Sequence, residues 1–552
     1  MSGSLGRAGA VVASGTLVSR VLGFVNALLL YNTIGTVGQG ADAFALANQL
    51  PNNIYAIVAG GTLTAVIVPA IIRATGHEDG GERFLNRLVT LSLALFAVIA
   101  IAVTVAAPLL VHLYAQTGGD GSRGFSEPQL ALAYAFAYWC LPQVFFYAMF
   151  AILSEITNAR GVFWPYAWAP VVNNVVFAAV LVAFRLAFGS ADGLAAADWT
   201  PSMIVLLAGG ATLGIAVQAF TLVLAWRRTG IRFRPDFRLR GVGLGAVGRL
   251  WAWTFGMVLV GQAVGILESN VASQATGSAS IATLGVAWLV FMLPYSVATL
   301  SILVPYFTRM SRHATQGDRA ALGADLTSAT TNAMLVLVFA EIGLAVMAPG
   351  IAEVFSSSAE GVRAVLLVLS AYLLGLVPFS VTLIVQRTFF ALQDTRTPFW
   401  LQTGQAVVTA AGLIGVLFAP TDAIGPLVAL VVSLANWATA IASIVVARRR
   451  VPEFDVARVA SRFGWFLLAM VPAAAAGFAT GLGVGGTWIL THAGPWWFAL
   501  LDCTAMGVVM AVVYALALLL TRNPELRAVA RPLLRRLRRR DAADAPPSGP
   551  AE

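Results

Sequence analysis

Residues 497–521 read WFALLDCTAMGVVMAVVYALALLLT, and Asp502 is the single charged side chain among these 25 residues. A helix needs about 20 mostly apolar residues to cross the hydrocarbon core of a bilayer, which is about 30 Å thick. This stretch therefore predicts a transmembrane helix. The same test along the whole chain predicts fourteen spans, at residues 8–34, 42–72, 88–114, 130–157, 164–188, 202–226, 247–275, 280–308, 324–349, 362–391, 398–419, 424–447, 463–490 and 497–521.

The composition agrees with a chain made mostly of such helices. Of its 552 residues, 59% are hydrophobic and 11% are charged, and the mean hydropathy is +0.82. Soluble domains carry about 25% charged residues. These values exclude a soluble globular enzyme, and they predict an all-α protein that crosses the membrane many times.

The positive charges predict how the spans are oriented. All 34 basic residues are arginine, and the formal net charge is +9. With a cytoplasmic N-terminus, 29 arginines fall in cytoplasmic segments and three in outer loops, while Arg20 and Arg387 lie within spans. Because short cytoplasmic loops carry the excess of basic residues, this asymmetry predicts an even number of spans and two cytoplasmic termini.

Two segments, 227–249 and 531–540, are densely basic. Binding of nucleic acid or of lipid is one interpretation of them. Topological anchoring beside anionic headgroups explains them more simply, so no nucleic-acid partner is predicted. The proline-containing tail after Arg540 is expected to be disordered.

Three landmarks recur at similar distances along the chain. They are Leu50-Pro51 and Leu293-Pro294, 243 residues apart, Val68-Pro69 and Val304-Pro305, 236 apart, and the loops that end at Pro165 and Pro398, 233 apart. Many transporters contain such repeats, although chance recurrence of proline is the alternative. Because six spans separate the copies, the repeat is predicted to be parallel.

This repeat predicts the domain organisation. The predicted parts are an N-lobe of six helices (1–226), a basic cytoplasmic linker (227–249), a C-lobe of six helices (250–447), two further helices (448–521) and a cytoplasmic tail (522–552).

Arg20 is the most informative charge inside a span, because an ionised group at mid-bilayer costs at least about 2.5 kcal/mol and needs a partner or a wet cavity. A guanidinium there would bind phosphate or carboxylate well. An internal ion pair with Asp42 or Glu268 is the alternative. Glu268 and Glu341 are predicted to bind a proton or cation, or to be neutral and hydrogen-bonded. Asn48, Asn52 and Tyr55 share one helix face and favour a central cavity.

No soluble catalytic motif is present in the sequence. The chain has no phosphate-binding loop for ATP, its four histidines form no metal motif, and its two cysteines lie in apolar runs. The sequence therefore predicts a protein that is not an enzyme and carries no cofactor. Active transport would draw on a Na⁺ or H⁺ gradient, on the membrane potential or on substrate consumption.

Several motifs together resemble one family. Ser19-Arg20-Val21-Leu22-Gly23-Phe24, followed by Ala41-Asp42-Ala43-Phe44 and Gln49-Leu50-Pro51-Asn52, is similar to the N-terminal motif of the MviN/MurJ family of lipid II flippases. Residues 158–170 and 389–398 resemble two further motifs of that family, and Leu293-Pro294 with Val304-Pro305 fits a fourth. The family belongs to a wider group of multidrug, oligosaccharide-lipid and peptidoglycan-precursor exporters.

The resemblance implies a function and a site. It implies two six-helix lobes around a cavity, a final helix pair that forms a groove for the lipid tail, and alternating access that carries lipid II from the cytoplasmic to the outer leaflet of a bacterial membrane. Arg20 would meet the diphosphate. The residues expected to bind substrate are Arg20, Ser19, Asn26, Asp42, Asn48, Asn52, Tyr55 and Glu268, and the expected hinges are Gly23, Pro51 and Pro294. Cell-wall synthesis and division proteins are possible partners, with membrane lipids.

The sequence also departs from the family pattern. Cavity arginines of better-known members are replaced at Asn26, Tyr55 and Ala56, an acidic residue is replaced at Gly60, and an Arg and a Glu before the Leu-Pro pair are replaced at Leu289 and Met292. The predicted cavity is therefore less positive than the family pattern implies.

Alternative functions stay open from the sequence. They are a flippase for another polyprenyl-diphosphate-linked glycan, a multidrug antiporter that uses Glu268 or Glu341, and a scaffold for wall-synthesis enzymes. Asp394 and Thr397 are candidate ligands of a coupling cation, with a hydrogen bond that orders their loop as the alternative.

Overall fold

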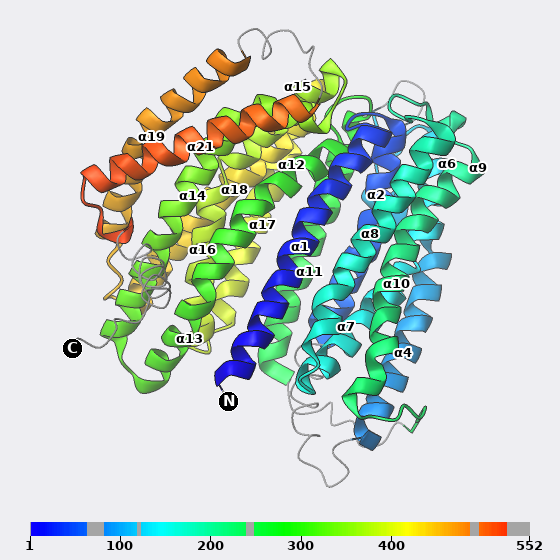
Figure 1. Ribbon diagram of the computed structural model, residues 1–552, viewed down its shortest axis with the longest axis horizontal. Helices are drawn as coiled ribbons and strands as arrows, with labels where there is room; N and C mark the ends of the chain where they lie inside the picture. Colours follow the sequence, from blue (N-terminus) through cyan, green and yellow to red (C-terminus); the bar gives the residue numbers. More distant parts are fainter. Residues whose placement is uncertain (1, 63–81, 119–122, 239–247, 486–495, 527–552) are drawn as a thin grey trace, which may run out of the picture. The chain divides into compact units, whose positions relative to one another are not determined.

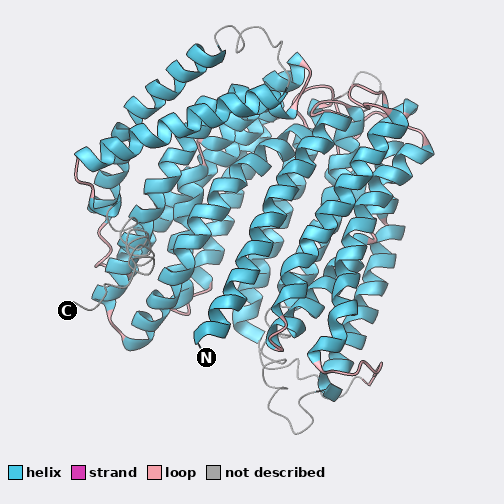
Figure 2. Cartoon of the chain, viewed as in Figure 1, coloured by secondary structure: helices cyan, strands magenta, loops and turns pink. Residues whose placement is uncertain are grey.

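The structure is a computed structural model that describes residues 2–62, 82–118, 123–238, 248–485 and 496–526. Within these residues the chain is almost entirely helical (Figure 2), and an isolated bridge between Thr117 and Phe125 takes the place of any β-strand. The predicted all-α class is confirmed.

Figure 1 shows the described helices in chain order. They are α1 (Ser2–Ile34), α2 (Gln39–Thr62), α4 (Glu82–Val105), α5 (Ala107–Tyr114), α6 (Glu127–Cys140), α7 (Gln143–Ala159), α8 (Phe163–Phe188), α9 (Pro201–Ile204), α10 (Gly210–Ala225), α11 (Gly248–Ala272), α12 (Ile281–Pro294), α13 (Leu300–Gln316), α14 (Arg319–Phe355), α15 (Ala359–Leu373), α16 (Leu376–Ala391), α17 (Arg396–Val416), α18 (Ile424–Arg450), α19 (Val456–Gly485) and α21 (Trp496–Leu520). Single π-helical turns, Val205–Gly209 and Tyr295–Thr299, precede α10 and α13.

By their contacts the residues divide into two compact units. The first comprises Met1–Trp288, Ala352–Ala371 and Thr395–Ala435, and the second comprises Leu289–Ile351, Tyr372–Asp394 and Asn436–Glu552. The domain limits expected from the sequence stay a prediction.

Twelve described helices are long and apolar enough to cross a membrane, or thirteen if the bent pair α15 and α16 counts as one span. The chain is therefore a multi-pass membrane protein. The predicted fourteenth span is the second one, at residues 42–72, of which the structure describes only the part within α2. The count of fourteen stays a prediction.

The bent pair shows how the protein satisfies backbone groups at a helix break. α15 and α16 meet at an angle of 41°. Ser433 Oγ donates to the carbonyl oxygen of Ala371 at 2.7 Å, and Trp437 Nε1 donates to that of Leu374 at 2.8 Å. On the other side of the break, Glu341 Oε2 accepts a hydrogen bond from the backbone N–H of Val377 at 2.9 Å. Such partners are required because hydrocarbon offers none.

The same device occurs 233 residues earlier, between α6 and α7. Here Pro142 interrupts the span, because proline has no N–H and breaks the helical hydrogen-bond ladder. Thr212 Oγ1 donates to the carbonyl oxygen of Trp139 at 2.7 Å and accepts from Gln143 Nε2 at 3.0 Å. We call the predicted spans one to six and seven to twelve the two halves of the chain. In each half a hydroxyl from the sixth predicted span (α10 or α18) completes a break in the fourth.

A second correspondence links the start of the third span of each half to the segment that follows the sixth. Thr90 Oγ1 of α4 accepts from the backbone N–H of Asp236, and Thr327 Oγ1 of α14 accepts from that of Asp455, both at 3.1 Å. Each aspartate then accepts a backbone N–H farther along, from Arg238 or Arg458. The two halves thus share an anchor between distant segments, which we call the Thr-Asp anchor.

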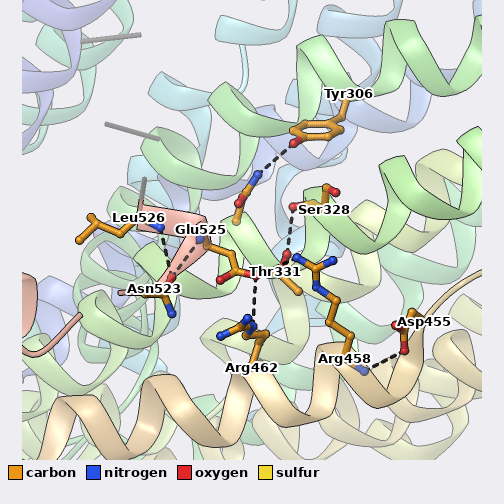
Figure 3. Close-up of polar contacts among 10 residues, drawn as sticks. Tyr306, Ser328, Thr331, Asp455, Arg458, Arg462, Asn523, Glu525 and Leu526 are labelled. Carbon is orange, nitrogen blue, oxygen red and sulfur yellow. Dashed lines mark hydrogen bonds and ion pairs between the residues drawn. The ribbon is translucent and has the colours of Figure 1, made fainter. Parts of the chain in front are cut away.

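In the second half this anchor leads directly into the final helix pair. α19 and α21 pack side by side (Figure 1). Glu525, just beyond α21, is 3% exposed and accepts from Arg458 and Arg462 of α19, each at 3.2 Å (Figure 3). Asn523 Oδ1 accepts the backbone N–H groups of Glu525 and Leu526. A buried carboxylate therefore joins the two helices at this end.

Replacement of that carboxylate tests its contribution to stability. We expect Glu525→Gln to lower the free energy of unfolding by about 1–3 kcal/mol, because it removes the charge from two hydrogen bonds, and hydrogen bonds to charged groups contribute about 1.5–3 kcal/mol each. Thermal unfolding in detergent measures the effect. Glu453→Gln, at an exposed carboxylate, is the matched control, and an equal loss in both variants would contradict the assignment.

Candidate functional site

The region that carries the predicted substrate residues is built on α1, which packs along α8 (Figure 1). Gly15 lets the helices approach closely, since a Cβ there would lie 2.5 Å from the carbonyl oxygen of Ala167. Farther along the same face, Asn174 Nδ2 of α8 donates to the carbonyl and hydroxyl oxygens of Ser19 at 2.8 and 3.1 Å. Asn26 Nδ2 donates to the backbone oxygen of Asn174 at 2.9 Å and to its Oδ1 at 3.2 Å.

Ser19 and Asn26 therefore contact α8 in this conformation. Sequence reasoning missed Asn174, which occupies both. The signal that points to it is the series of small or short polar residues Gly15, Ser19, Gly23 and Asn26 at spacings of three and four, which is typical of a close helix contact in membranes. Their role in substrate binding stays a prediction.

Arg20 lies on a different face of α1. One residue along an α-helix turns by about 100°, so Arg20 shares its face with Phe24 and Tyr31, four and eleven residues later. The rings of Phe24 and Tyr31 lie 5.5 and 6.5 Å from that of Phe355. The Arg20 side chain is half-buried, and it does not lie on the face occupied by Asn174.

Asp42 is a capping residue inside the first unit. Its side chain is fully buried, and Oδ1 accepts the backbone N–H of Ala282 at 3.0 Å. Ala282 lies in the first turn of α12, where backbone N–H groups have no partner within the helix. Thr283 Oγ1 donates to the carbonyl oxygen of Thr36 at 2.7 Å and joins the same two segments. The carboxylate of Asp42 thus stabilises the start of α12.

The predicted polar stripe of α2 divides between two environments. Tyr55 packs into an aromatic cluster, with ring centroids 6.5 Å from Phe96 and 5.8 Å from Tyr147. Asn52 is exposed, and Asn48 is half-buried. Pro51 lies buried within the helix between them.

Glu268 belongs to α11, which packs against α2. Its side chain is half-buried. The neighbouring Ser269 Oγ accepts from Gln49 Nε2 at 3.1 Å. A polar contact between α2 and α11 therefore lies next to Glu268.

The remaining predicted residues lie at helix boundaries. Pro294 is the last residue of α12 and precedes the π-helical turn at Tyr295–Thr299, a feature that is frequent at functional sites. Asp394 lies between α16 and α17, and its N–H donates to the carbonyl oxygen of Phe389 at 2.9 Å. Within the part of the chain that the structure describes, no group of three or more His, Cys, Asp or Glu side chains is arranged to hold a metal ion. A cation at Asp394 and Thr397 stays a prediction.

A family model described as "Lipid II flippase MurJ" matches residues 32–490. The chain belongs to this family. The probable lipid II flippase MurJ of Rhizobium tropici is 28% identical over 459 residues, which cover 81% of this chain and 82% of that protein. The family match favours lipid II transport over the other functions that the sequence left open.

Solved structures agree on the fold. A lipid II flippase MurJ in an inward closed conformation matches with a TM-score of 0.68 at 19% identity, and the match covers 93% of this chain and 99% of that one. An inward-facing multidrug transporter of the MATE family matches with a TM-score of 0.60 at 17% identity over 79% of this chain and 98% of that one. The fold is thus shared with multidrug transporters, and membership of the MurJ family rests on the sequence.

Asp42 offers a test that separates capping from charge. We expect Asp42→Ala to lower the free energy of unfolding by about 1–3 kcal/mol, since it leaves a buried N–H without an acceptor. Asp42→Asn keeps an acceptor oxygen and should retain most of the stability. Thermal unfolding compares the two variants, and equal losses in both would contradict the capping role.

Gly23 offers a test of the predicted hinge. A Cβ at Gly23 would have Asn174 Oδ1 as its nearest neighbour, at 4.0 Å. Gly23→Ala therefore fits, and we expect it to stabilise α1 by up to about 1 kcal/mol through helix propensity. If Gly23 acts as a hinge, the same substitution should also slow transport. Gly15→Ala is the contrasting variant, because its Cβ meets the backbone of α8, and it should destabilise the protein. Unchanged transport by Gly23→Ala would contradict the hinge.

Proposed function

We propose that this chain moves lipid II from the cytoplasmic to the outer leaflet of a bacterial inner membrane by alternating access. The observation that carries the proposal is the family match over residues 32–490. The position of Arg20 supports it, because this residue stands deep in the first span on a face of α1 other than the one that packs on α8.

The chemistry of the substrate explains why one deep arginine matters. Lipid II carries a diphosphate between its polyprenyl tail and its disaccharide-pentapeptide. A guanidinium binds phosphate oxygens through two parallel N–H groups and keeps its charge at any physiological pH. In the proposed mechanism Arg20 binds the diphosphate, and amide side chains such as Asn48 and Asn52 add neutral donors. Asp42 contributes by fixing the start of α12.

The long lipid tail needs an apolar path of its own. In the proposal α19 and α21 supply it. These helices expose large apolar side chains along their length, among them Leu468, Val471 and Phe478 on α19, and Val508, Val512 and Leu516 on α21. Such side chains fit acyl or polyprenyl chains better than water.

The distribution of arginine supports the orientation. Both termini are cytoplasmic in the proposal, which puts the basic segments beside the anionic inner leaflet. The proposed energy source is the membrane potential or a Na⁺ or H⁺ gradient, with Asp394 and Thr397 as the candidate cation ligands. Contacts with cell-wall synthesis and division proteins would place the transporter where its product is consumed.

Complementation tests the role of Arg20. In cells depleted of this protein, we expect lipid II to accumulate in the inner leaflet and to be inaccessible to a probe added outside. The wild-type gene restores outer accessibility. Arg20→Ala should fail to do so, and Arg20→Lys should restore part, since lysine keeps the charge but loses the bidentate geometry.

Arg312→Ala is the matched control, because Arg312 is an exposed arginine on α13. Membrane levels of each variant are measured in the same cells. Full restoration by Arg20→Ala would remove Arg20 from substrate binding. Outer accessibility of lipid II that is unchanged on depletion would contradict the proposed function itself.

A further inference from the structure

A strongly basic hollow lies in the first unit, beside the beginning of α4. Its volume is about 1320 Å³. Five arginines line it, two from α4 (Arg83 and Arg87) and three from the segment after α10 (Arg232, Arg234 and Arg238), against two carboxylates. The lining therefore carries three net positive charges, contributed by segments that are about 150 residues apart.

The walls of the hollow are held in place by the protein itself. Asn86 Nδ2 donates to the carbonyl oxygen of Arg232 at 2.9 Å, and the backbone N–H of Arg232 donates to Glu82 Oε1 at 3.2 Å. Arg87 pairs with Asp236 at 3.0 Å. The backbone N–H of Arg238 and the guanidinium of Arg87 lower the pKa of Asp236 from its usual value, so these contacts favour the carboxylate form of Asp236. A flexible topological anchor would not need these bonds.

The second half of the chain shows that the fold does not require most of these arginines. The Thr-Asp anchor aligns Thr90 with Thr327 and Asp236 with Asp455. By this alignment Arg83, Arg87, Arg232 and Arg234 correspond to Ala320, Ala324, Val451 and Glu453. Arg238 corresponds to Arg458, since each donates its backbone N–H to the anchor aspartate. The same anchor therefore forms without four of the five arginines. Their concentration in one copy indicates a binding role.

We propose that this hollow binds the phosphate of an anionic phospholipid headgroup in the cytoplasmic leaflet. The choice of leaflet rests on the orientation given in the proposed function. The hollow lies where α4 begins, and α4 is a candidate membrane span from Glu82, so its depth matches the headgroup layer. Arginine binds phosphate oxygens in a bidentate manner. The volume exceeds the range of about 300–1,000 Å³ that holds drug-sized ligands, so it accommodates a headgroup with its glycerol rather than a bare phosphate.

Direct binding to the purified full chain in detergent tests this site. The probes are dioctanoyl phosphatidylglycerol, dioctanoyl phosphatidylcholine and sodium phosphate, measured by thermophoresis without lipid II. We expect saturable binding of phosphatidylglycerol and at least tenfold weaker binding of the other two. Arg83→Ala with Arg234→Ala should weaken phosphatidylglycerol binding about 30-fold, since each basic residue near an anionic surface contributes about 1 kcal/mol.

The matched control is Arg312→Ala with Arg319→Ala, which removes the same charge from exposed positions outside the hollow. It should bind within about twofold of wild type, and thermal unfolding checks that both double variants are folded. An equal loss in the control, or equal affinity for phosphatidylcholine, would overturn the site. If sodium phosphate bound as tightly as phosphatidylglycerol, and its binding were also lost in the Arg83 and Arg234 variant, the assignment to a lipid would be overturned. Because lipid II is absent, these results are independent of the Arg20 test of transport.

Discussion

The structure depends on one constraint, which is that a backbone N–H or C=O inside hydrocarbon must find its partner within the protein. Continuous helices meet this constraint by themselves, but a transporter whose spans bend must satisfy the groups that each bend releases. Polar side chains inside the spans do this work. Ser433 and Trp437, for example, donate hydrogen bonds to the backbone carbonyl groups that the break between α15 and α16 leaves without a helical partner. Thr212 does the same beside Pro142.

One buried and one half-buried carboxylate accept hydrogen bonds from backbone N–H groups that the same constraint leaves without a partner. Asp42 accepts an N–H from the first turn of α12, and Glu341 accepts one from the first turn of α16. The N-terminus of a helix carries a partial positive charge, which makes it a suitable partner for a carboxylate far from water. Two acidic residues whose presence in a membrane-embedded sequence is unusual thus cap the first turn of a helix. An intramembrane charge indicates a site, and here part of that signal comes from helix capping.

The difference between what could and could not be predicted follows from this. Hydropathy predicted the helical class and most spans, because apolar length is a local property. Pro142 is evident in the sequence, but the residue that completes the break, Thr212, lies seventy residues away and could not be identified from the sequence. Arg20 could be identified because any charged side chain within a span is energetically costly. Asn174 is neutral, and its role depends on its contacts with Ser19 and Asn26 on another helix. The spacing of Gly15, Ser19 and Gly23 does indicate this helix contact in the sequence, but it indicates close packing and not a binding site.

Comparison of the two predicted six-helix lobes separates the contacts that the fold needs from those that function adds. In each half the fourth span is interrupted, and a hydroxyl from the sixth span completes the interruption. A threonine and an aspartate join the third span of each half to the segment that follows its sixth span. These contacts are uncharged or use a single aspartate, and they recur although the surrounding sequence has diverged. Most of the arginines do not recur. Five line the hollow at the first anchor, whereas the second anchor keeps only Arg458, in the place of Arg238, and there Arg458 and Arg462 bind a buried glutamate. The arginines of each half therefore make different contacts, on a scaffold that hydrogen bonds to hydroxyl, carbonyl and aspartate oxygens already hold.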